Sequence, residues 1–212
     1  MTTAERTPAA VWREMEEGNA RFVAGEPRHP HQDAERRTEL SGYQRPDAAL
    51  FGCSDSRLAA EIIFDKGLGD LFVVRNAGQI VSDSVVGSLE YAVAVLEVPL
   101  IVVLAHDECG AVRAAIDQAG PNAPTLPAHI RSLVTQIMPA VQRVRIAAGS
   151  PGVDTIDAFE VGRQHLRDTV GALLSASELI SEAVAAGRLA IVGANYQLHD
   201  GRVNADAVVG AV

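Results

Sequence analysis

The sequence contains few residues of several types, and each scarcity excludes a class of protein. Only two of the 212 residues are cysteines, too few for the disulfide framework of a small secreted domain. Lys and Arg number 18 against 27 Asp and Glu, giving a net charge of −9, whereas a nucleic-acid-binding protein needs clustered basic residues. The longest apolar run, around residues 98–105, contains Pro99 and is far shorter than the roughly 20 residues of a membrane span. We therefore expect no nucleic-acid partner and no membrane partner.

The residues that are present suffice for one domain with a large hydrophobic core. Hydrophobic residues make up 48% of the chain, no break in composition divides it, and the apolar content suits a homo-oligomer. The start of the sequence, Met-Thr-Thr-Ala-Glu-Arg, lacks the basic and apolar regions of a signal peptide. With two widely spaced cysteines that suit a reducing compartment, these features predict a single cytoplasmic domain over residues 1–212.

Apolar periodicity divides the chain into an N-terminal arm, residues 1–46, and an α/β core, residues 47–212. The arm holds an amphipathic helix over residues 8–24, which packs either on its own core or over a neighbouring chain, and then a surface connection with room for one helical turn. Strands are predicted at 48–52, 71–74, 100–105 and 189–194, with a short final strand after residue 201. Core helices are predicted at 58–64, 83–96, 109–118, 128–147 and 155–186. This alternation predicts a mostly parallel central β-sheet flanked by helices.

The two cysteines and one histidine follow two of the predicted strands. Cys53 comes directly after the strand at 48–52, and His106 and Cys109 come directly after the strand at 100–105. In an open α/β sheet the carboxyl ends of the strands form the edge at which ligands bind. Two thiolates and an imidazole are zinc ligands, and a set of three leaves a coordination position open, as in catalytic zinc sites. The residues alone also allow a metal-free interpretation, in which the cysteines are buried as small hydrophobic residues.

Asp55 and Arg57 favour the catalytic interpretation. Two thiolates cancel the formal charge of zinc, so such an ion acidifies water less than one held by neutral imidazoles, and a nearby hydrogen-bond acceptor becomes useful. Asp55 is that acceptor, and paired hydrogen bonds from Arg57 would keep it ionised and oriented. Without Arg57, Asp55 could become a fourth metal ligand. The competing interpretation is an ordinary turn that caps the following helix, with a surface ion pair.

Together these segments resemble the β-class carbonic anhydrases. The resemblance is carried by C-S-D-S-R at 53–57 and H-D-E-C-G at 106–110, in this order. It extends over nearly the whole chain, although residues 121–160 match no motif of the family. The further matching segments are G-N-A-R-F at 18–22, G-Y-Q-R-P at 42–46, F-V-V-R-N-A-G at 72–78, G-S-L-E-Y-A-V at 87–93 and the segment 196–201.

The resemblance implies a zinc enzyme that reversibly hydrates CO2 to bicarbonate and a proton by means of zinc-bound hydroxide. It implies Zn²⁺ on Cys53, His106 and Cys109, with Asp55 and Arg57 as a catalytic dyad. It further implies a homodimer or homotetramer in which the N-terminal helical arm packs on a partner subunit. The implied substrate-binding residues, some of them contributed by the other subunit, are Gln44, Phe72, Ala77, Tyr91 and Gly110.

Two alternatives remain open at this point: a related zinc hydrolase acting on COS or CS2, and a non-catalytic zinc or redox-sensing module.

The sequence departs from the family at an inhibitory bicarbonate site. Some bacterial members hold an inhibitory bicarbonate between a tryptophan, an arginine and a tyrosine, and here Leu50 stands at the tryptophan position while Arg75 and Tyr196 match the other two. We expect this inhibitory site to be absent or weakened.

Overall fold

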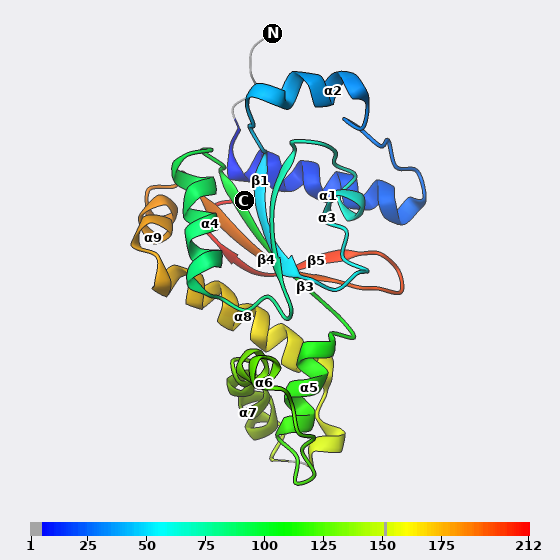
Figure 1. The fold of residues 1–212 in the computed structure, drawn as a ribbon, viewed down its shortest axis with the longest axis vertical. Helices are drawn as coiled ribbons and strands as arrows, with labels where there is room; N and C mark the ends of the chain where they lie inside the picture. The colour runs from blue at the N-terminus through cyan, green and yellow to red at the C-terminus, as the bar shows by residue number, and fades with distance from the viewer. Residues whose placement is uncertain (1–5, 151) are drawn as a thin grey trace.

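Five strands form a single sheet in residues 6–150 and 152–212, which the structure, a computed structural model, describes (Figure 1). The order across the sheet is β2-β1-β3-β4-β5; the first four strands pair in parallel, and β5 is antiparallel to β4. The strands are β1 Ala48–Cys53, β2 Leu71–Asn76, β3 Leu100–His106, β4 Ala190–Tyr196 and β5 Val203–Val209. The prediction of a mostly parallel sheet is confirmed. A final strand follows residue 201 as predicted, but it is not short, because β5 has seven residues, as many as β3 and β4.

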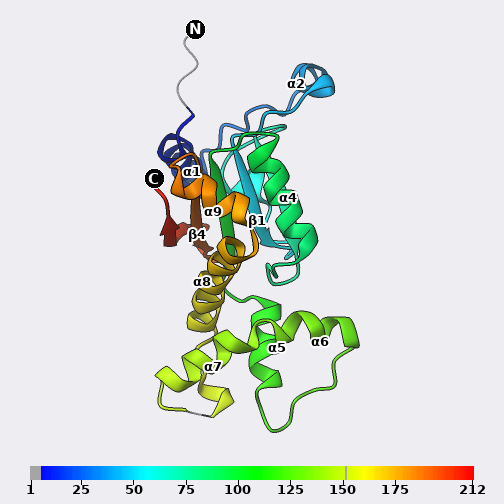
Figure 2. The same cartoon turned by 90° about the vertical axis from the view of Figure 1, so that its left-hand side faces the viewer.

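Helices cover both faces of this sheet. One face packs against α1 and α3, and the other against α4, α8 and α9, while α5, α6 and α7 lie beyond the carboxyl ends of the parallel strands (Figure 2). The helices are α1 Pro8–Ala24, α2 Ala34–Glu39, α3 Ala60–Ile63, α4 Asp83–Ala94, α5 Gly110–Gln118, α6 Ala128–Thr135, α7 Met138–Ala147, α8 Ala158–Ala176 and α9 Glu178–Ala185, with short 3₁₀ turns at Leu40–Gly42 and Val153–Thr155.

The double coverage explains why the central strands are uninterrupted apolar runs. Along β1, Ala48 and Leu50 join the hydrophobic cluster on the α1 face, whereas Ala49 and Phe51 join the cluster on the α8 face. Every residue of β1, β3 and β4 is buried. A strand covered on only one face would instead alternate apolar and polar residues.

The two long helical patterns are each broken once, contrary to the sequence prediction. Ser177 separates α8 from α9 in an extended conformation (φ −131°), and its hydroxyl accepts from the Ile180 N–H and donates to Glu90 Oε1 at 2.6 Å. The break between α6 and α7 precedes Pro139, which has no N–H to donate to the carbonyl of Thr135. The helix predicted at 58–64 is also shorter than expected, because only α3 is helical there.

The first helix of the predicted arm packs on its own chain. Its buried residues include Trp12, Met15 and Gly18, and Asn19 Nδ2 donates to the carbonyls of Ile63 and Gly201 at 3.1 and 2.8 Å. By contrast α2 buries none of its residues and stands away from the core (Figure 2). Residues 1–5 of the predicted arm lie outside the described residues. Packing of the arm on a partner, and the arm and core boundaries themselves, stay predictions.

No helix within residues 6–150 and 152–212 has both the length and the apolar character that a membrane span needs.

Replacing Gly18 by Ala is expected to destabilise the fold by about 2 kcal/mol, because a Cβ at this position would lie 1.9 Å from the carbonyl oxygen of Phe64. A backbone atom cannot swing aside, so α1 has to shift. Gly87→Ala in α4 is the matched control: nothing lies within 4 Å of its Cβ, and the helix should gain up to about 1 kcal/mol. The free energy of unfolding in urea measures both, and equal stability of the two variants would contradict the prediction.

Candidate metal centre

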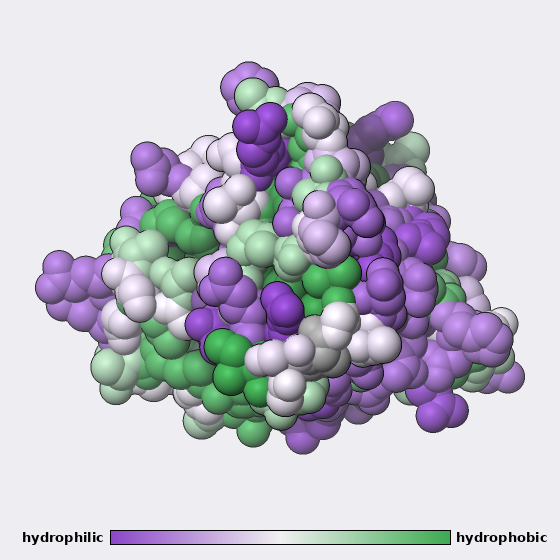
Figure 3. All heavy atoms as spheres, turned by 90° about the horizontal axis from the view of Figure 1, so that it is seen from below, coloured by the Kyte–Doolittle hydropathy of each residue, from purple (hydrophilic) through white to green (hydrophobic). Residues whose placement is uncertain are grey.

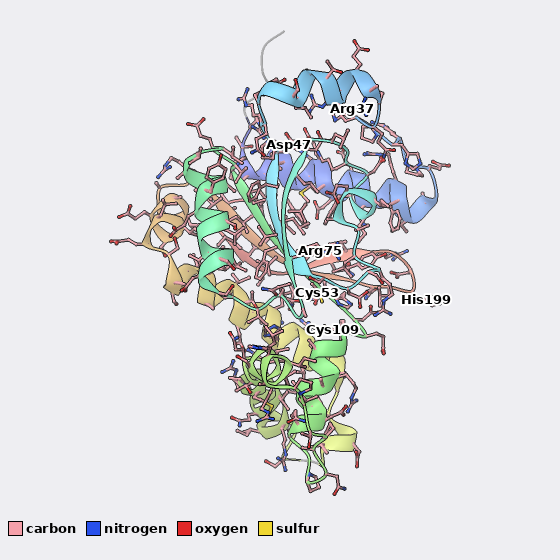
Figure 4. All side chains as sticks on the ribbon, in the orientation of Figure 1. Arg37, Asp47, Cys53, Arg75, Cys109 and His199 are labelled. Carbon is pink, nitrogen blue, oxygen red and sulfur yellow. The ribbon has the colours of Figure 1, made fainter. Side chains whose placement is uncertain are left out.

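The candidate residues meet where the direction of the chain across the sheet reverses. Strands β1 and β3 are neighbours, but β1 continues to β2 on one side whereas β3 is followed by β4 on the other. Connections that leave neighbouring strands in opposite directions open a crevice at their carboxyl ends. Cys53 is the last residue of β1 and His106 the last of β3, and Cys109 caps α5. Figure 4 shows Cys53 and Cys109 close together at this edge.

Three of the predicted ligands converge on one point. The ligand atoms of Cys53, His106 and Cys109 all lie within 4.8 Å of one another, and the three residues are buried. His106 Nδ1 is 2.6 Å from the carbonyl oxygen of Asp107, to which it must donate, so the lone pair is on Nε2. Within the described residues this Nε2 is buried without a hydrogen-bond partner. A buried acceptor lone pair beside two sulfur atoms fits a thiophilic metal ion such as Zn²⁺.

Backbone N–H groups favour the thiolate form of both cysteines. A hydrogen bond with Cys109 lowers the pKa of Cys53 most, followed by contributions from His106 and from the N–H groups of Gly78 and Asp55. Cys109 donates the proton in that pair, and this raises its own pKa, while N–H groups at the start of α5 act in the opposite direction. A metal ion would replace the shared proton and bind both sulfur atoms as thiolates.

Asp55 is bound by Arg57 on both of its oxygens. Arg57 Nε donates to Oδ1 at 2.9 Å and an Arg57 terminal nitrogen donates to Oδ2 at 2.8 Å, while the Arg57 backbone N–H also donates to Oδ1. The same guanidinium reaches the carbonyl of Glu108, one residue before Cys109. These hydrogen bonds hold the pKa of Asp55 well below its usual range. Asp55 Oδ2 lies 3.9 Å from His106 Nε2, so an ionised carboxylate stands beside the three candidate ligands.

Arg75 has a role that sequence reasoning missed. Its Nε donates to the carbonyl of Cys53 at 2.9 Å, and a terminal nitrogen donates to the carbonyl of Asp55 at 2.6 Å. It therefore fixes the backbone that carries both the first candidate ligand and the carboxylate. The available signal was its place in β2, beside Gly52 in the register, at the end of the sheet where Cys53 lies. Leu50 is buried and Tyr196 ends β4, and neither residue tests the predicted weakening of an inhibitory site.

One chain brings together only part of the predicted substrate pocket. Gly110 begins α5 next to Cys109, and Ala77 follows β2 at the same edge. Phe72, however, pairs with Ala49, four residues before Cys53 and therefore about 13 Å away along the strand.

The two other pocket residues lie with Phe72 rather than with the candidate ligands. The ring of Tyr91 lies 6.1 Å from that of Phe72. Gln44 is exposed and precedes Asp47, which Figure 4 places at the opposite end of β1 from Cys53. Gln44, Phe72 and Tyr91 therefore lie away from the metal centre of their own chain.

Comparison with known sequences places these residues in a family. The sequence profile of the carbonic anhydrase family matches residues 48–203. The chain is 52% identical over 196 residues to carbonic anhydrase 2 of Mycobacterium tuberculosis, covering 92% of this chain and 91% of that protein. It is 48% identical over 205 residues to the carbonic anhydrase of Mycolicibacterium smegmatis, covering 97% and 96% of the two chains.

Comparison with solved structures gives the same fold at lower sequence identity. A tetrameric β-carbonic anhydrase of Sordaria macrospora superposes with a TM-score of 0.71 at 24% identity, covering 95% of this chain and 100% of that one. A β-carbonic anhydrase of Aspergillus fumigatus has a TM-score of 0.71 at 22% identity, covering 93% and 89%. These likenesses support the architecture described above.

Cys53→Ser is expected to abolish stoichiometric zinc binding, because a serine hydroxyl does not ionise near neutral pH and cannot replace a thiolate ligand. Elemental analysis after zinc loading and buffer exchange should find about one zinc per wild-type chain and almost none in the variant. His129→Gln, at an exposed histidine of α6, is the control and should keep its zinc. Equal zinc content in Cys53→Ser and wild type would contradict the assignment.

Proposed function

The chain belongs to the β-class carbonic anhydrases and is a lyase of that family, and on this basis we propose that it hydrates CO2 reversibly to bicarbonate and a proton with a zinc ion on Cys53, His106 and Cys109. The observation that carries the proposal is the convergence of these three buried ligand atoms, with His106 Nε2 left without a partner among the described residues. The remaining roles below follow from the contacts of the chain's own residues.

The zinc ion would supply Lewis acidity that makes a water molecule nucleophilic at neutral pH. Asp55 supplies the hydrogen-bond acceptor for that water. Its pKa lies far below neutrality because Arg57 donates to both of its oxygens, so at pH 7 it accepts hydrogen bonds and carries no proton of its own. Asp55 therefore orients the attacking water, and removal of the proton requires another acceptor.

Arg57 would keep Asp55 from becoming a metal ligand. With both oxygens engaged by one guanidinium, the carboxylate has no free lone-pair direction as favourable as the paired hydrogen bonds. We propose that Asp55 becomes a zinc ligand only when this pair breaks. The three-ligand site is then open in the active state and closed in a state without the Asp55–Arg57 contact.

The substrate would be bound by a backbone N–H and by an amide side chain. Gly110 is the first residue of α5, where N–H groups have no partner within the helix, and its backbone is exposed beside Cys109. Gln44 would bind a second oxygen. Phe72, Ala77 and Tyr91 would form the apolar wall that holds CO2 and limits the access of bulk water.

Each active site is proposed to need two chains. The support is that Gln44, Phe72 and Tyr91 lie at the end of the sheet remote from the metal centre of their own chain. A homodimer, alone or paired into a homotetramer, would place them against the metal centre of the partner. The helix α2, which buries none of its residues, and the connection around it are the part of the arm that would pack on that partner. Ile130 on α6 and Ile146 on α7 are exposed hydrophobic residues. Hydrophobic surface also gathers on the face seen from below (Figure 3).

Two free buried thiols suit a reducing compartment, and a cytoplasmic location is proposed on that ground. COS and CS2 belong in the substrate panel because the same open zinc site could attack their carbon atoms. Hydration of CO2 is the proposed physiological activity.

Arg57→Ala is expected to lower kcat/KM for CO2 hydration by about 100-fold or more, because Asp55 would lose the hydrogen bonds that orient it as an acceptor. Zinc content should stay near that of wild type, because no proposed metal ligand is removed. Stopped-flow hydration by zinc-loaded protein from pH 7 to 9 is the assay. Arg113→Ala is the matched control, since Arg113 donates to Asp117 by the same chemistry on the exposed face of α5. A wild-type rate equal to that of buffer would overturn the proposed function, and full activity of Arg57→Ala would overturn the role of the dyad.

Two inactive variants should restore each other when they are expressed together. In a mixed pair of Cys53→Ser and Gln44→Ala chains, one site receives both an intact metal centre and an intact Gln44. Half of randomly formed pairs are mixed and each has one intact site, so about one quarter of the wild-type rate per chain is expected. If Gln44 served its own chain, both sites of a mixed pair would be defective, and the absence of restored activity would contradict the two-chain site.

A further inference from the structure

A tight turn after β2 supplies a hydrogen bond to the first candidate metal ligand. The Gly78 N–H donates to Cys53 Sγ at 3.3 Å. Gly78 has a φ of +79°, and a Cβ there would lie 2.8 Å from the Cβ of Ala111. The turn is closed by Asn76, whose amide side chain bonds both the N–H and the carbonyl of Ile80 at 2.7 Å. The orientation of the Gly78 N–H thus depends on a backbone conformation that few residues adopt.

A histidine far away in the sequence anchors this turn. His165 lies on α8 and is only 5% exposed, and its Nε2 is 2.8 Å from the carbonyl oxygen of Gly78. A carbonyl oxygen only accepts, so Nε2 carries the proton and donates it. Burial lowers the pKa of His165, which favours the neutral ring in this tautomer. His165 is therefore a directional donor, fixed by a long helix, on the residue that donates to Cys53.

The two sulfur ligands differ in how their N–H donors are supported. Cys109 receives N–H groups of Ala111 and Val112, which lie in the first turn of α5 and are oriented by its helical backbone. The Gly78 donor of Cys53 belongs to a turn and has no helix to orient it. The hydrogen bond from His165 orients the Gly78 turn from outside, whereas α5 orients the N–H donors of Cys109.

We propose that His165 is a positioning residue for the metal centre, which holds the Gly78 turn so that its N–H donates to Cys53 Sγ. The inference rests on the zinc site of the proposed function. An N–H donor withdraws electron density from a thiolate, and partners of this kind tune metal affinity and the electronic properties of the ligand. A histidine that merely satisfied its own buried hydrogen bond would leave the metal–sulfur bond unchanged when replaced.

Metal-bound protein with substitutions at position 165 separates these roles. His165→Leu removes the donor, whereas the amide nitrogen of His165→Gln has nearly the reach of Nε2. Thr169→Val is the control for a disturbed core, because Thr169 is buried one turn further along α8 and its hydroxyl bonds only the carbonyl of His165 among the contacts described. The readouts are the thiolate-to-metal charge-transfer band of the cobalt(II)-substituted protein and zinc affinity in competition with a chelator.

For His165→Leu we expect the cobalt band to move to longer wavelength and zinc affinity to fall about 10- to 100-fold, since an outer contact of a ligand is lost. His165→Gln and Thr169→Val should stay close to wild type in both readouts. If His165→Leu does not fold, His165→Asn takes its place, because its amide nitrogen falls short of the Nε2 position and should give the same changes.

Unchanged band position and affinity in the donor-free variant would overturn the inference while leaving the zinc site intact. Equal changes in Thr169→Val, or no rescue by His165→Gln, would also overturn it, because loosening of the core would then explain the result. Failure of the wild-type protein to bind cobalt or zinc would overturn the proposed function and the inference together.

Discussion

The parallel pairing of β1 with β3 is the constraint on which the functional site depends. It places Cys53 and His106 at the ends of neighbouring strands although 52 positions separate them in the sequence numbering. Because the chain leaves these two strands toward opposite sides of the sheet, their carboxyl ends form a topological switch point, where α/β sheets bind ligands. The buried Ile, Val and Leu residues of β3 hold this pairing from both faces, so the stability of the sheet and the geometry of the metal centre have the same origin.

Two arginine side chains hold the loop that carries Asp55 at this edge of the sheet. Arg57 binds the Asp55 side chain, and Arg75 binds the backbone carbonyls of Cys53 and Asp55, so two guanidinium groups fix one short loop. The hydrogen bond between the two cysteines lowers the pKa of Cys53 and raises that of Cys109, while N–H groups from Gly78 and α5 favour the thiolate forms. A metal ion here would bind two sulfur atoms as thiolates beside a carboxylate whose charge is already compensated by Arg57.

The structure also divides the predicted active site into two parts. The candidate ligands and the Asp55–Arg57 pair lie at the carboxyl end of the sheet, while Phe72 and Tyr91 contact each other toward the other end. In such a division the metal centre can form within a single chain but the apolar pocket cannot. If two chains share each site, as proposed above, their association would complete the pocket.

The sequence by itself determined the α/β class, the strand positions and the three metal-ligand candidates. Their short-range signals are strong: fully apolar strands, and reactive side chains directly after them. It also indicated the Asp55–Arg57 pair, because two side chains separated by one residue in a tight loop can contact each other. Local patterns did not predict the breaks at Ser177 and before Pro139, because periodicity continues through both. Only the tertiary structure decided the contacts of Arg75 and of His165, and the separation of Phe72 from Cys53. These features depend on the order of the strands and on contacts between residues far apart in the sequence, such as His165 and Gly78, which are 87 positions apart. Such long-range geometry leaves no local pattern in the chain.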